Sequence, residues 1–553
     1  MEYTSIDAEL FAKLFLAGAK RLEANKDIIN ELNVFPVPDG DTGINMTMTI
    51  MSAAKEVAAI DKPDMATLCK AISGGSLRGA RGNSGVILSQ LFRGFTKVIK
   101  KEEILTVPII CEAFQKSVET AYRAVMKPKE GTILTVARAA ADKALELVDS
   151  TDDIVVFAEA IVEEAKAVLE RTPDMLPVLK QAGVVDAGGQ GLVEVLSGVL
   201  DLLNGKEIDL SLEGAQEKQE SEEYKFLYEL SLKLSTLPEF SAQDEADIKV
   251  YLESIADQLN LTKEKEALLV SLLTNEPGRA INKVLKHGSI SNVSLTNLRD
   301  DKGNGTSSSG QPVSESSAAE ATPSIELIET SEEPKDVGFV TVSIGDGLNQ
   351  IFKDLGADAV IAGGQTMNPS TEDILSAVEK VNAPVVFVLP NNKNIILAAN
   401  QARDLCKDKK VIVLPTKTIP QGISAMINYI PDQTPEDNEA NLIEELKYVA
   451  SGEVTYAVRD TTIDDKEIKA GDYMGIGDAG ILAVDKEIDE VMIKMLSEMI
   501  TDESAIITLY YGEDVKKKDA KNIAAKVMET YPSIEVELQK GGQPVYFYVV
   551  SVE

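Results

Sequence analysis

Apolar side chains recur every three to four positions through the first 205 residues, which is the spacing of one face of an α-helix. The pattern begins at Leu10, Phe11, Leu14 and Phe15. Apolar and polar residues do not alternate convincingly in this region, so the pattern predicts no strand here. We therefore predict an all-α domain over residues 1–205. Beyond residue 45 its helical patterns cover residues 46–57, 83–101, 106–126, 131–149, 153–170 and 188–204.

The pattern changes after a polar, acidic connector at about residues 206–222. Residues 223–300 contain two apolar runs, at 224–234 and 267–273, that predict strands, and helical patterns near 242–259 and 277–287. This order predicts a small α/β middle domain. Residues 301–335 are rich in Gly, Ser, Ala and Glu. That composition cannot bury a core, so it predicts a flexible linker.

Residues 336–553 alternate between strand and helix patterns, which predicts parallel βαβ units and an α/β domain. Functional loops in such sheets follow the carboxyl ends of the strands. Here those loops are rich in amides and hydroxyls, and they lack the acid–base and nucleophile–base pairs that mark catalysis. The loops are Gly363–Pro369, Pro390–Asn394 and Pro415–Thr418.

Charge and composition narrow the possible functions. The 55 Lys and Arg against 90 Asp and Glu give a net charge of −35, which argues against nucleic acid or an anionic membrane as the main partner. The three cysteines, Cys69, Cys111 and Cys406, are far apart, so we predict no disulfide framework and no thiolate zinc site. Only one histidine, His287, is present, which nearly excludes histidine relay chemistry. No signal peptide or membrane-spanning apolar run is found, so we expect a soluble, cytoplasmic protein without stable membrane insertion.

The first candidate site is the segment Asp39-Gly40-Asp41-Thr42-Gly43-Ile44-Asn45, which lies between two helical patterns. Carboxylate oxygens are the ligands that Mg²⁺ prefers, and Gly40 has no side chain to obstruct the turn between the two aspartates. Thr42, Gly43 and Asn45 would begin the next helix and are candidates for binding the cofactor. An ordinary Asp-Gly turn is the alternative for the motif taken alone.

Three further segments are candidates for binding a phosphorylated ligand. A Gly-rich loop over residues 74–85 could present backbone N–H groups to a phosphate at a helix start, although close helix packing through small residues explains it equally well. Two other motifs begin helices near residues 131 and 186, where Asp186 is at least as well explained as an N-cap. The candidate side chains and glycines in these segments are Gly75, Ser76, Arg81, Asn83, Ser84, Gly131, Thr132, Asp186 and Gly188.

Two long motifs carry a resemblance to a known family. Asn-Val-Phe-Pro-Val-Pro-Asp-Gly-Asp-Thr-Gly at 33–43 and Gly-Ala-Arg-Gly-Asn-Ser-Gly-Val-Ile-Leu-Ser-Gln at 79–90 resemble the ATP-binding subunit of bacterial fatty acid kinase, the FakA family. Its first domain resembles the L subunit of dihydroxyacetone kinase. The resemblance implies an eight-helix barrel that binds ATP and two Mg²⁺ ions, held by Asp39 and Asp41. The nearest candidate for a third metal ligand is Asn33.

The resemblance also implies a partner and a reaction. A separate DegV-like fatty-acid-binding protein presents the carboxylate of a fatty acid, and the γ-phosphoryl group of ATP is transferred to it, which gives an acyl phosphate for phospholipid synthesis. The C-terminal domain is expected to dock this partner and to resemble the K subunit of dihydroxyacetone kinase without its catalytic histidine. For the oligomeric state we expect a homodimer, the commonest symmetric assembly.

One part of the chain departs from the family pattern. Family members carry a zinc-type site in the middle domain, and its ligand positions fall here on Leu227, Ser271 and Leu273. These side chains are not zinc ligands of that kind. We therefore predict that this protein binds no zinc.

Two other functions stay open. The first is a kinase of the same class with a different small acceptor, such as a hydroxyketone, although capture of a ketone in the K-type subunit uses a histidine that this chain lacks. The second is a nucleotide-binding regulatory or scaffold protein with weak catalysis. The absent zinc ligands favour it, whereas the paired aspartates Asp39 and Asp41 oppose it.

Overall fold

The computed structural model describes the chain from residue 3 to residue 553 apart from these gaps: 34–39, 126, 213–227, 237–247, 250–251, 253–255, 265–266, 275–276, 286, 298–324, 328–334, 365–367, 458–460, 464–465 and 479. The chain divides into two compact units. One contains Met1–Ala215 together with Ala321–Glu553, and the other is Gln216–Glu320.

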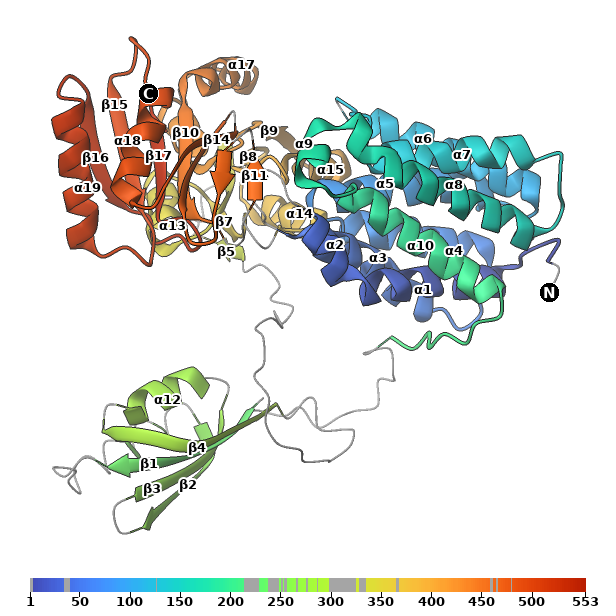
Figure 1. Cartoon of the computed structure of the whole chain (residues 1–553), viewed down its shortest axis with the longest axis horizontal. Helices are drawn as coiled ribbons and strands as arrows, with labels where there is room; N and C mark the ends of the chain where they lie inside the picture. The colour runs from blue at the N-terminus through green and yellow to red at the C-terminus, as the bar shows by residue number, and fades with distance from the viewer. Residues whose placement is uncertain are drawn as a thin grey trace. The chain divides into compact units, whose positions relative to one another are not determined.

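The N-terminal part of the first unit is helical, as predicted. Its long helices run alternately in opposite directions (Figure 1), and their apolar faces meet in one shared core. The helices are α1 (Ala8–Ala24), α2 (Lys26–Leu32), α3 (Thr42–Ala58), α4 (Met65–Arg78), α5 (Gly82–Ile99), α6 (Val107–Ala124), α7 (Ile133–Leu147), α8 (Ile154–Met175), α9 (Pro177–Ala182) and α10 (Ala187–Leu203).

Close approach of backbones explains several of the glycines in these helices. A Cβ added to Gly198 of α10 would lie 2.6 Å from the carbonyl oxygen of Ala17 and 2.9 Å from the Cα of Gly18. The two helices are also joined by Arg21, whose Nε donates to Glu194 Oε2 at 2.7 Å. Small residues thus bring α1 and α10 together, and a partly buried ion pair fixes their register.

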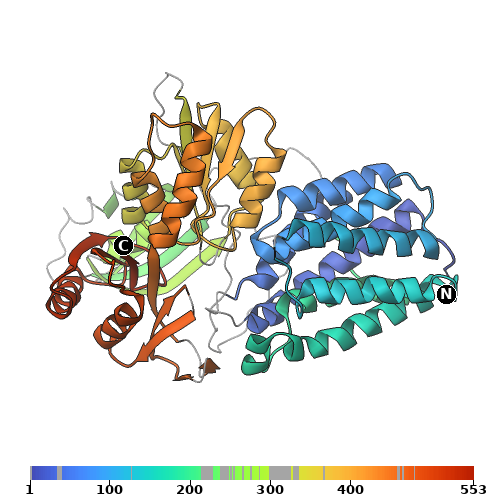
Figure 2. The same cartoon turned by 90° about the horizontal axis from the view of Figure 1, so that it is seen from above.

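The C-terminal part of the first unit begins with a five-stranded sheet of order β5-β7-β6-β8-β9. Pairing among β7, β6, β8 and β9 is parallel, as the βαβ pattern predicted. Helices cover both faces (Figure 2), because alternate strand residues such as Phe339 and Val340 enter two different core clusters. The elements are β5 (Ile325–Leu327), β6 (Val337–Ser343), α13 (Asp346–Asp354), β7 (Ala359–Ala362), α14 (Thr371–Lys380), β8 (Val385–Leu389), α15 (Ile396–Leu405), β9 (Lys410–Val413), α16 (Ile419–Ile427) and α17 (Pro435–Glu445).

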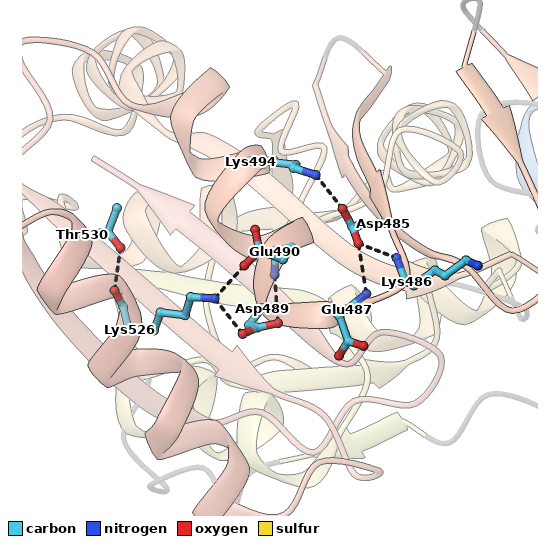
Figure 3. A network of polar contacts seen from close by, with 8 residues as sticks. All are labelled: Asp485, Lys486, Glu487, Asp489, Glu490, Lys494, Lys526 and Thr530. Carbon is cyan, nitrogen blue, oxygen red and sulfur yellow. Dashed lines mark hydrogen bonds and ion pairs between the residues drawn. The ribbon is translucent and has the colours of Figure 1, made fainter.

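A six-stranded mixed sheet of order β14-β13-β10-β17-β15-β16 follows. Helices α18 (Ile488–Met499) and α19 (Lys517–Thr530) pack on it. Lys526 of α19 joins them, because its Nζ lies 2.7 Å from Asp489 and 2.9 Å from Glu490 of α18 (Figure 3). A short hairpin, β11 (Thr461–Ile463) and β12 (Lys466–Ile468), stands apart from the six strands. The other elements are β10 (Ala450–Tyr456), β13 (Tyr473–Gly477), β14 (Gly480–Asp485), β15 (Ile506–Tyr511), β16 (Glu535–Lys540) and β17 (Tyr548–Val552).

The second unit contains an antiparallel sheet of order β2-β3-β1-β4. Leucines of β1 and β3 share a core with Ala280 and Val284 of the helix α12. The predicted helix near 242–259 is wrong at its C-terminal end, because residues from Ala256 onward form a strand. The elements are β1 (Tyr228–Thr236), β2 (Ala256–Glu264), β3 (Ala267–Thr274), α12 (Pro277–Leu285) and β4 (Gly288–Asn297).

Among the described residues, no helix combines the length and the apolar composition needed to cross a membrane. The eight-helix barrel and the domain boundaries near residues 205, 223, 300 and 336 stay predictions.

Candidate functional site

The starts of helices α3 and α5 lie side by side, and each carries one of the predicted motifs. Gly82 begins α5 with a positive φ of 56°. A Cβ added to it would lie 2.6 Å from the Nδ2 atom of Asn45 in the first turn of α3. A Cβ added to Gly85, one turn further, would lie 3.0 Å from the carbonyl oxygen of Asn45. Glycine is therefore required where the two helices converge.

The starts of α7 and α10 lie next to the same place. A Cβ added to Gly188 of α10 would lie 3.3 Å from the Cβ of Ile133, the first residue of α7. A Cβ added to Gly191 would lie 2.7 Å from the sulfur of Met46, in α3. Four helix N-termini thus meet at one end of the helical part. The positive ends of their dipoles favour a negatively charged group such as phosphate.

Asp41 is the N-cap residue of α3, one of these four helices. Its side chain is buried, with 4% of the residue exposed, and Oδ2 accepts a hydrogen bond of 2.6 Å from Nδ2 of Asn368. Burial raises the pKa of the Asp41 carboxyl, and hydrogen bonds from the Asn45 and Asn368 side chains oppose that rise. The donors are neutral amides, so burying the ionised carboxylate is costly unless a cation compensates its charge.

A magnesium ion would supply that compensation, and the carboxylate oxygens of Asp41 suit it as hard ligands. The first predicted metal ligand, Asp39, lies outside the described residues. Asn33 is the C-cap residue of α2. Thr42 and Gly43 follow Asp41 in the buried first turn of α3, where a Cβ on Gly43 would overlap the carbonyl oxygen of Lys26.

The predicted Gly-rich loop over residues 74–85 is wrong in its first half, because α4 continues to Arg78. Ser76 is fully buried in this helix, and its hydroxyl donates to the Ile72 carbonyl oxygen at 2.6 Å. Gly75 faces α3, where a Cβ would lie 2.7 Å from the Cα of Ala53. For Gly75 and Ser76 the structure therefore favours helix packing through small residues, the alternative that the sequence leaves open.

The second half of that segment turns toward the C-terminal part. Arg81 is 7% exposed, and its Nη1 donates to the carbonyl oxygen of Asn368 at 2.9 Å. Its Nη2 lies 3.5 Å from Asp373 Oδ2. Asn83, in the first turn of α5, donates from Nδ2 to Asn394 Oδ1 at 3.1 Å. Contact of Arg81, Asn83 and Ser84 with a nucleotide stays a prediction.

The two remaining motifs cap their helices. Thr132 is the N-cap of α7 and forms a capping box with Thr135, and Gly131 precedes it with a φ of 80°. Asp186 is the N-cap of α10, and its Oδ2 accepts a 2.6 Å hydrogen bond from the N–H of Gly189. Burial raises the pKa of Asp186 to about 6. The N-cap interpretation of Asp186 is therefore confirmed, and its role in ligand binding stays a prediction.

Sequence reasoning misses Asn368 as a site residue. Asn368 lies in the loop after β7, 327 positions from Asp41. The loop stands out in the sequence for its amides, but nothing in the local pattern links it to the helical part. The neighbouring positions 365–367 lie outside the described residues.

Comparison with known proteins gives matches to three family models. Residues 36–201 match the DAK2 domain. Residues 223–304 match the middle domain, and residues 338–553 the C-terminal domain, of FakA-like fatty acid kinase proteins. Protein YloV of Bacillus subtilis (strain 168) is 43% identical over 570 residues, with 100% of each chain covered. An uncharacterised protein of Staphylococcus aureus (strain MRSA252), SAR1202, is 39% identical over 562 residues, again with 100% of each chain covered.

Solved structures give weaker matches. The dihydroxyacetone kinase of C. freundii aligns with a TM-score of 0.31 at 12% identity, covering 41% of this chain and 52% of that one. The Streptococcus pneumoniae fatty acid kinase B3 protein loaded with linoleic acid aligns with a TM-score of 0.28 at 11% identity, covering 40% of this chain and 99% of that one. Alignments with TM-scores this low do not establish a shared fold.

Proposed function

The chain belongs to the FakA-like family of fatty acid kinase proteins, and from this premise we propose that it transfers the γ-phosphoryl group of ATP to the carboxylate of a fatty acid. The acceptor is presented by a separate DegV-like fatty-acid-binding protein. The product is an acyl phosphate, which is used in phospholipid synthesis.

The observation that carries this proposal is the convergence of four helix N-termini at one end of the helical part, with the buried carboxylate of Asp41 capping one of them. The helix ends offer N–H groups and positive potential to phosphate oxygens. A carboxylate at the same place offers oxygen ligands to a divalent cation. Phosphoryl transfer depends mainly on positioning and charge stabilisation, and this arrangement supplies both.

Each part of the site then has a proposed role. Asp41, with Asp39 on the preceding segment, would hold two Mg²⁺ ions, and Asn33 is a further candidate ligand. When bound, Mg²⁺ neutralises the charge of the phosphate oxygens. The residues that begin the four helices would bind the nucleotide. A fatty carboxylate is already an anionic nucleophile, so the site needs no strong base, which agrees with a chain that has one histidine.

The test is ATP turnover with Mg²⁺, a fatty acid and a DegV-like partner, with acyl phosphate trapped by hydroxylamine. Wild type is compared with Asp41→Asn and with the double variant Asp39→Ala/Asp41→Ala. Asp41→Asn keeps the volume of the side chain and removes its charge, so turnover should fall with little change in thermal stability. The double variant should form no acyl phosphate.

Lys526→Met serves as the control, because Lys526 lies in the ion-pair network between α18 and α19, the two helices that pack on the six-stranded sheet (Figure 3). Its turnover should match that of wild type. Nucleotide binding without turnover, across several lipid-binding partners, would contradict the proposal and favour a regulatory protein on a kinase scaffold.

A further inference from the structure

The loop after β7 and the start of α14 form a continuous contact with the helical part. The backbone N–H of Thr371 donates to the carbonyl oxygen of Ala80 at 3.1 Å. The Arg81 guanidinium donates to the carbonyl oxygen of Asn368 at 2.9 Å. The side chain of Asn368 then reaches Asp41, with 2.6 Å between Nδ2 and Oδ2. These three bonds place one amide of the C-terminal part against the proposed metal ligand.

Of the two polar atoms of the Asn368 side-chain amide, only the nitrogen has a hydrogen bond in the part of the chain that the structure describes. Asn368 is 2% exposed, and within the described ranges its Oδ1 atom has no hydrogen-bond partner. A buried carbonyl oxygen without a donor is unfavourable. Its nitrogen end is committed to Asp41, so the oxygen end is the part of this buried amide that still lacks a donor.

We propose that Asn368 is a positioning residue that completes the Mg²⁺ site of the helical part from the C-terminal part of the chain. Its amide nitrogen orients the Asp41 carboxylate, and its amide oxygen accepts a hydrogen bond from a water molecule on the ion. This inference rests on the proposed function, because it takes Asp41 to be a metal ligand.

The proposal follows from how metal sites are built. Carboxylates that bind metals are usually held by further hydrogen bonds, which fix their orientation, and loss of such a bond typically lowers metal affinity about 10- to 100-fold. Magnesium usually retains several water ligands, which are hydrogen-bond donors. An amide can serve both groups at once, because it carries a donor and an acceptor. A carboxylate at position 368 would instead repel Asp41.

The same contact could have the opposite effect, with the amide competing against the ion for Asp41. The two alternatives predict changes of opposite sign. If Asn368 positions Asp41, its removal weakens metal binding, whereas competition would make metal binding tighter. Metal affinity, measured directly, therefore decides between them without any turnover assay.

The experiment measures Mn²⁺ binding to the full chain by electron paramagnetic resonance, with a non-hydrolysable ATP analogue present. Asn368→Leu keeps the approximate volume and removes both the donor and the acceptor. Gln401→Leu is the matched control, because it removes the hydrogen bond that the Thr371 hydroxyl donates to Gln401 at the start of α14 but leaves Asn368, Asp41 and the proposed nucleotide-binding residues in place. Thermal melts of both variants report whether they fold.

We expect the dissociation constant for Mn²⁺ to rise about 10- to 100-fold in Asn368→Leu and to stay at the wild-type value in Gln401→Leu. An unchanged or lower constant in Asn368→Leu would overturn the inference, as would an equal rise in both variants. If Asn368→Leu does not fold, Asn368→Ser, which shortens the side chain without adding an apolar group, is judged by the same criteria. Failure of wild type to bind Mn²⁺ would instead overturn the proposed metal site itself.

Discussion

The Oδ2 atom of Asp186 accepts a hydrogen bond of 2.6 Å from the backbone N–H of Gly189 at the start of α10. This bond satisfies one of the N–H groups that a helix leaves unpaired at its N-terminus. Replacing Asp186 by Ala removes the acceptor and should lower the free energy of unfolding by about 1 kcal/mol. Urea denaturation at pH 5, below the raised pKa of about 6 of Asp186 in the folded protein, measures the loss. Asp186→Asn retains an acceptor and should lose much less.

The same residue makes the stability depend on pH. Burial raises the pKa of Asp186 from 3.8 to about 6 in the folded protein. Between these values the folded state binds more protons than the unfolded state, so the free energy of unfolding should fall as pH rises through this window. In Asp186→Asn this contribution disappears. The free energy of unfolding of the variant minus that of wild type should therefore be larger at pH 7 than at pH 4. Denaturation midpoints of both proteins at the two pH values test this, and an equal difference at both would contradict it.

Two adjacent glycines of α4 should respond in opposite directions to the same change. A Cβ on Gly74 would meet only the guanidinium end of Arg78, at 3.2 Å, which can move aside. Gly74→Ala should therefore raise the free energy of unfolding by up to about 1 kcal/mol, the difference in helix propensity. A Cβ on Gly75 would lie 2.7 Å from the backbone of Ala53 in α3. Gly75→Ala should lower stability by about 1–3 kcal/mol, because the two helices must separate. Thermal denaturation of the pair measures both signs, and a loss in Gly74→Ala would contradict this account of the packing.

Much of the fold follows from local patterns in the sequence. The helical periodicity predicts α5, α6, α7, α8 and α10, and the alternation of strand and helix patterns after residue 336 predicts the parallel pairing among β6, β7, β8 and β9. These elements present a long continuous apolar face or a buried run, so their local signal is strong. The start of strand β2 is mistaken for a helix because this strand is largely polar: its residues Ala256–Glu264 include Asp, Gln, Asn, Thr, Lys and Glu. Pairing with β3, which no local pattern of β2 reveals, decides its conformation.

In the candidate site, too, residues with a local sequence signal can be predicted, whereas residues that depend on long-range contacts cannot. Asp41 can be found from the sequence because a carboxylate in a Gly-bounded turn before a helix is a local signal. The helix that continues through Gly74 and Gly75 is mistaken for a loop, because glycine is a weak helix former and its reason for being there is contact with α3. Asn368 cannot be linked to Asp41 from one sequence, because only the folded chain brings together residues 327 positions apart.

The second unit provides a test of the prediction that the protein binds no zinc. Ser271 and Leu273 lie on β3, and the Ser271 hydroxyl is 3.3 Å from that of Ser231 on β1. Leu227 lies outside the described residues. Hydroxyl and alkyl groups do not replace the cysteine and histidine ligands of a structural zinc site. Purified protein should therefore contain no stoichiometric zinc by inductively coupled plasma mass spectrometry, and EDTA should not lower its melting temperature. One zinc per chain would contradict the prediction.

The ion pairs of Lys526 with Asp489 and Glu490 (Figure 3) should contribute to stability through electrostatic attraction. Lys526 on α19 contacts Asp489 and Glu490 on α18, and these two carboxylates raise its pKa. All three side chains are partly exposed, so salt should screen their attraction. Lys526→Met should lower the melting temperature slightly at low salt, and the difference from wild type should shrink at 1 M NaCl. Lys521→Met, at an exposed position on the same helix for which the structure describes no ion pair, is the matched control. If both variants lose the same stability at low salt, the loss comes from helix α19 itself, and the ion pairs between α18 and α19 contribute nothing measurable.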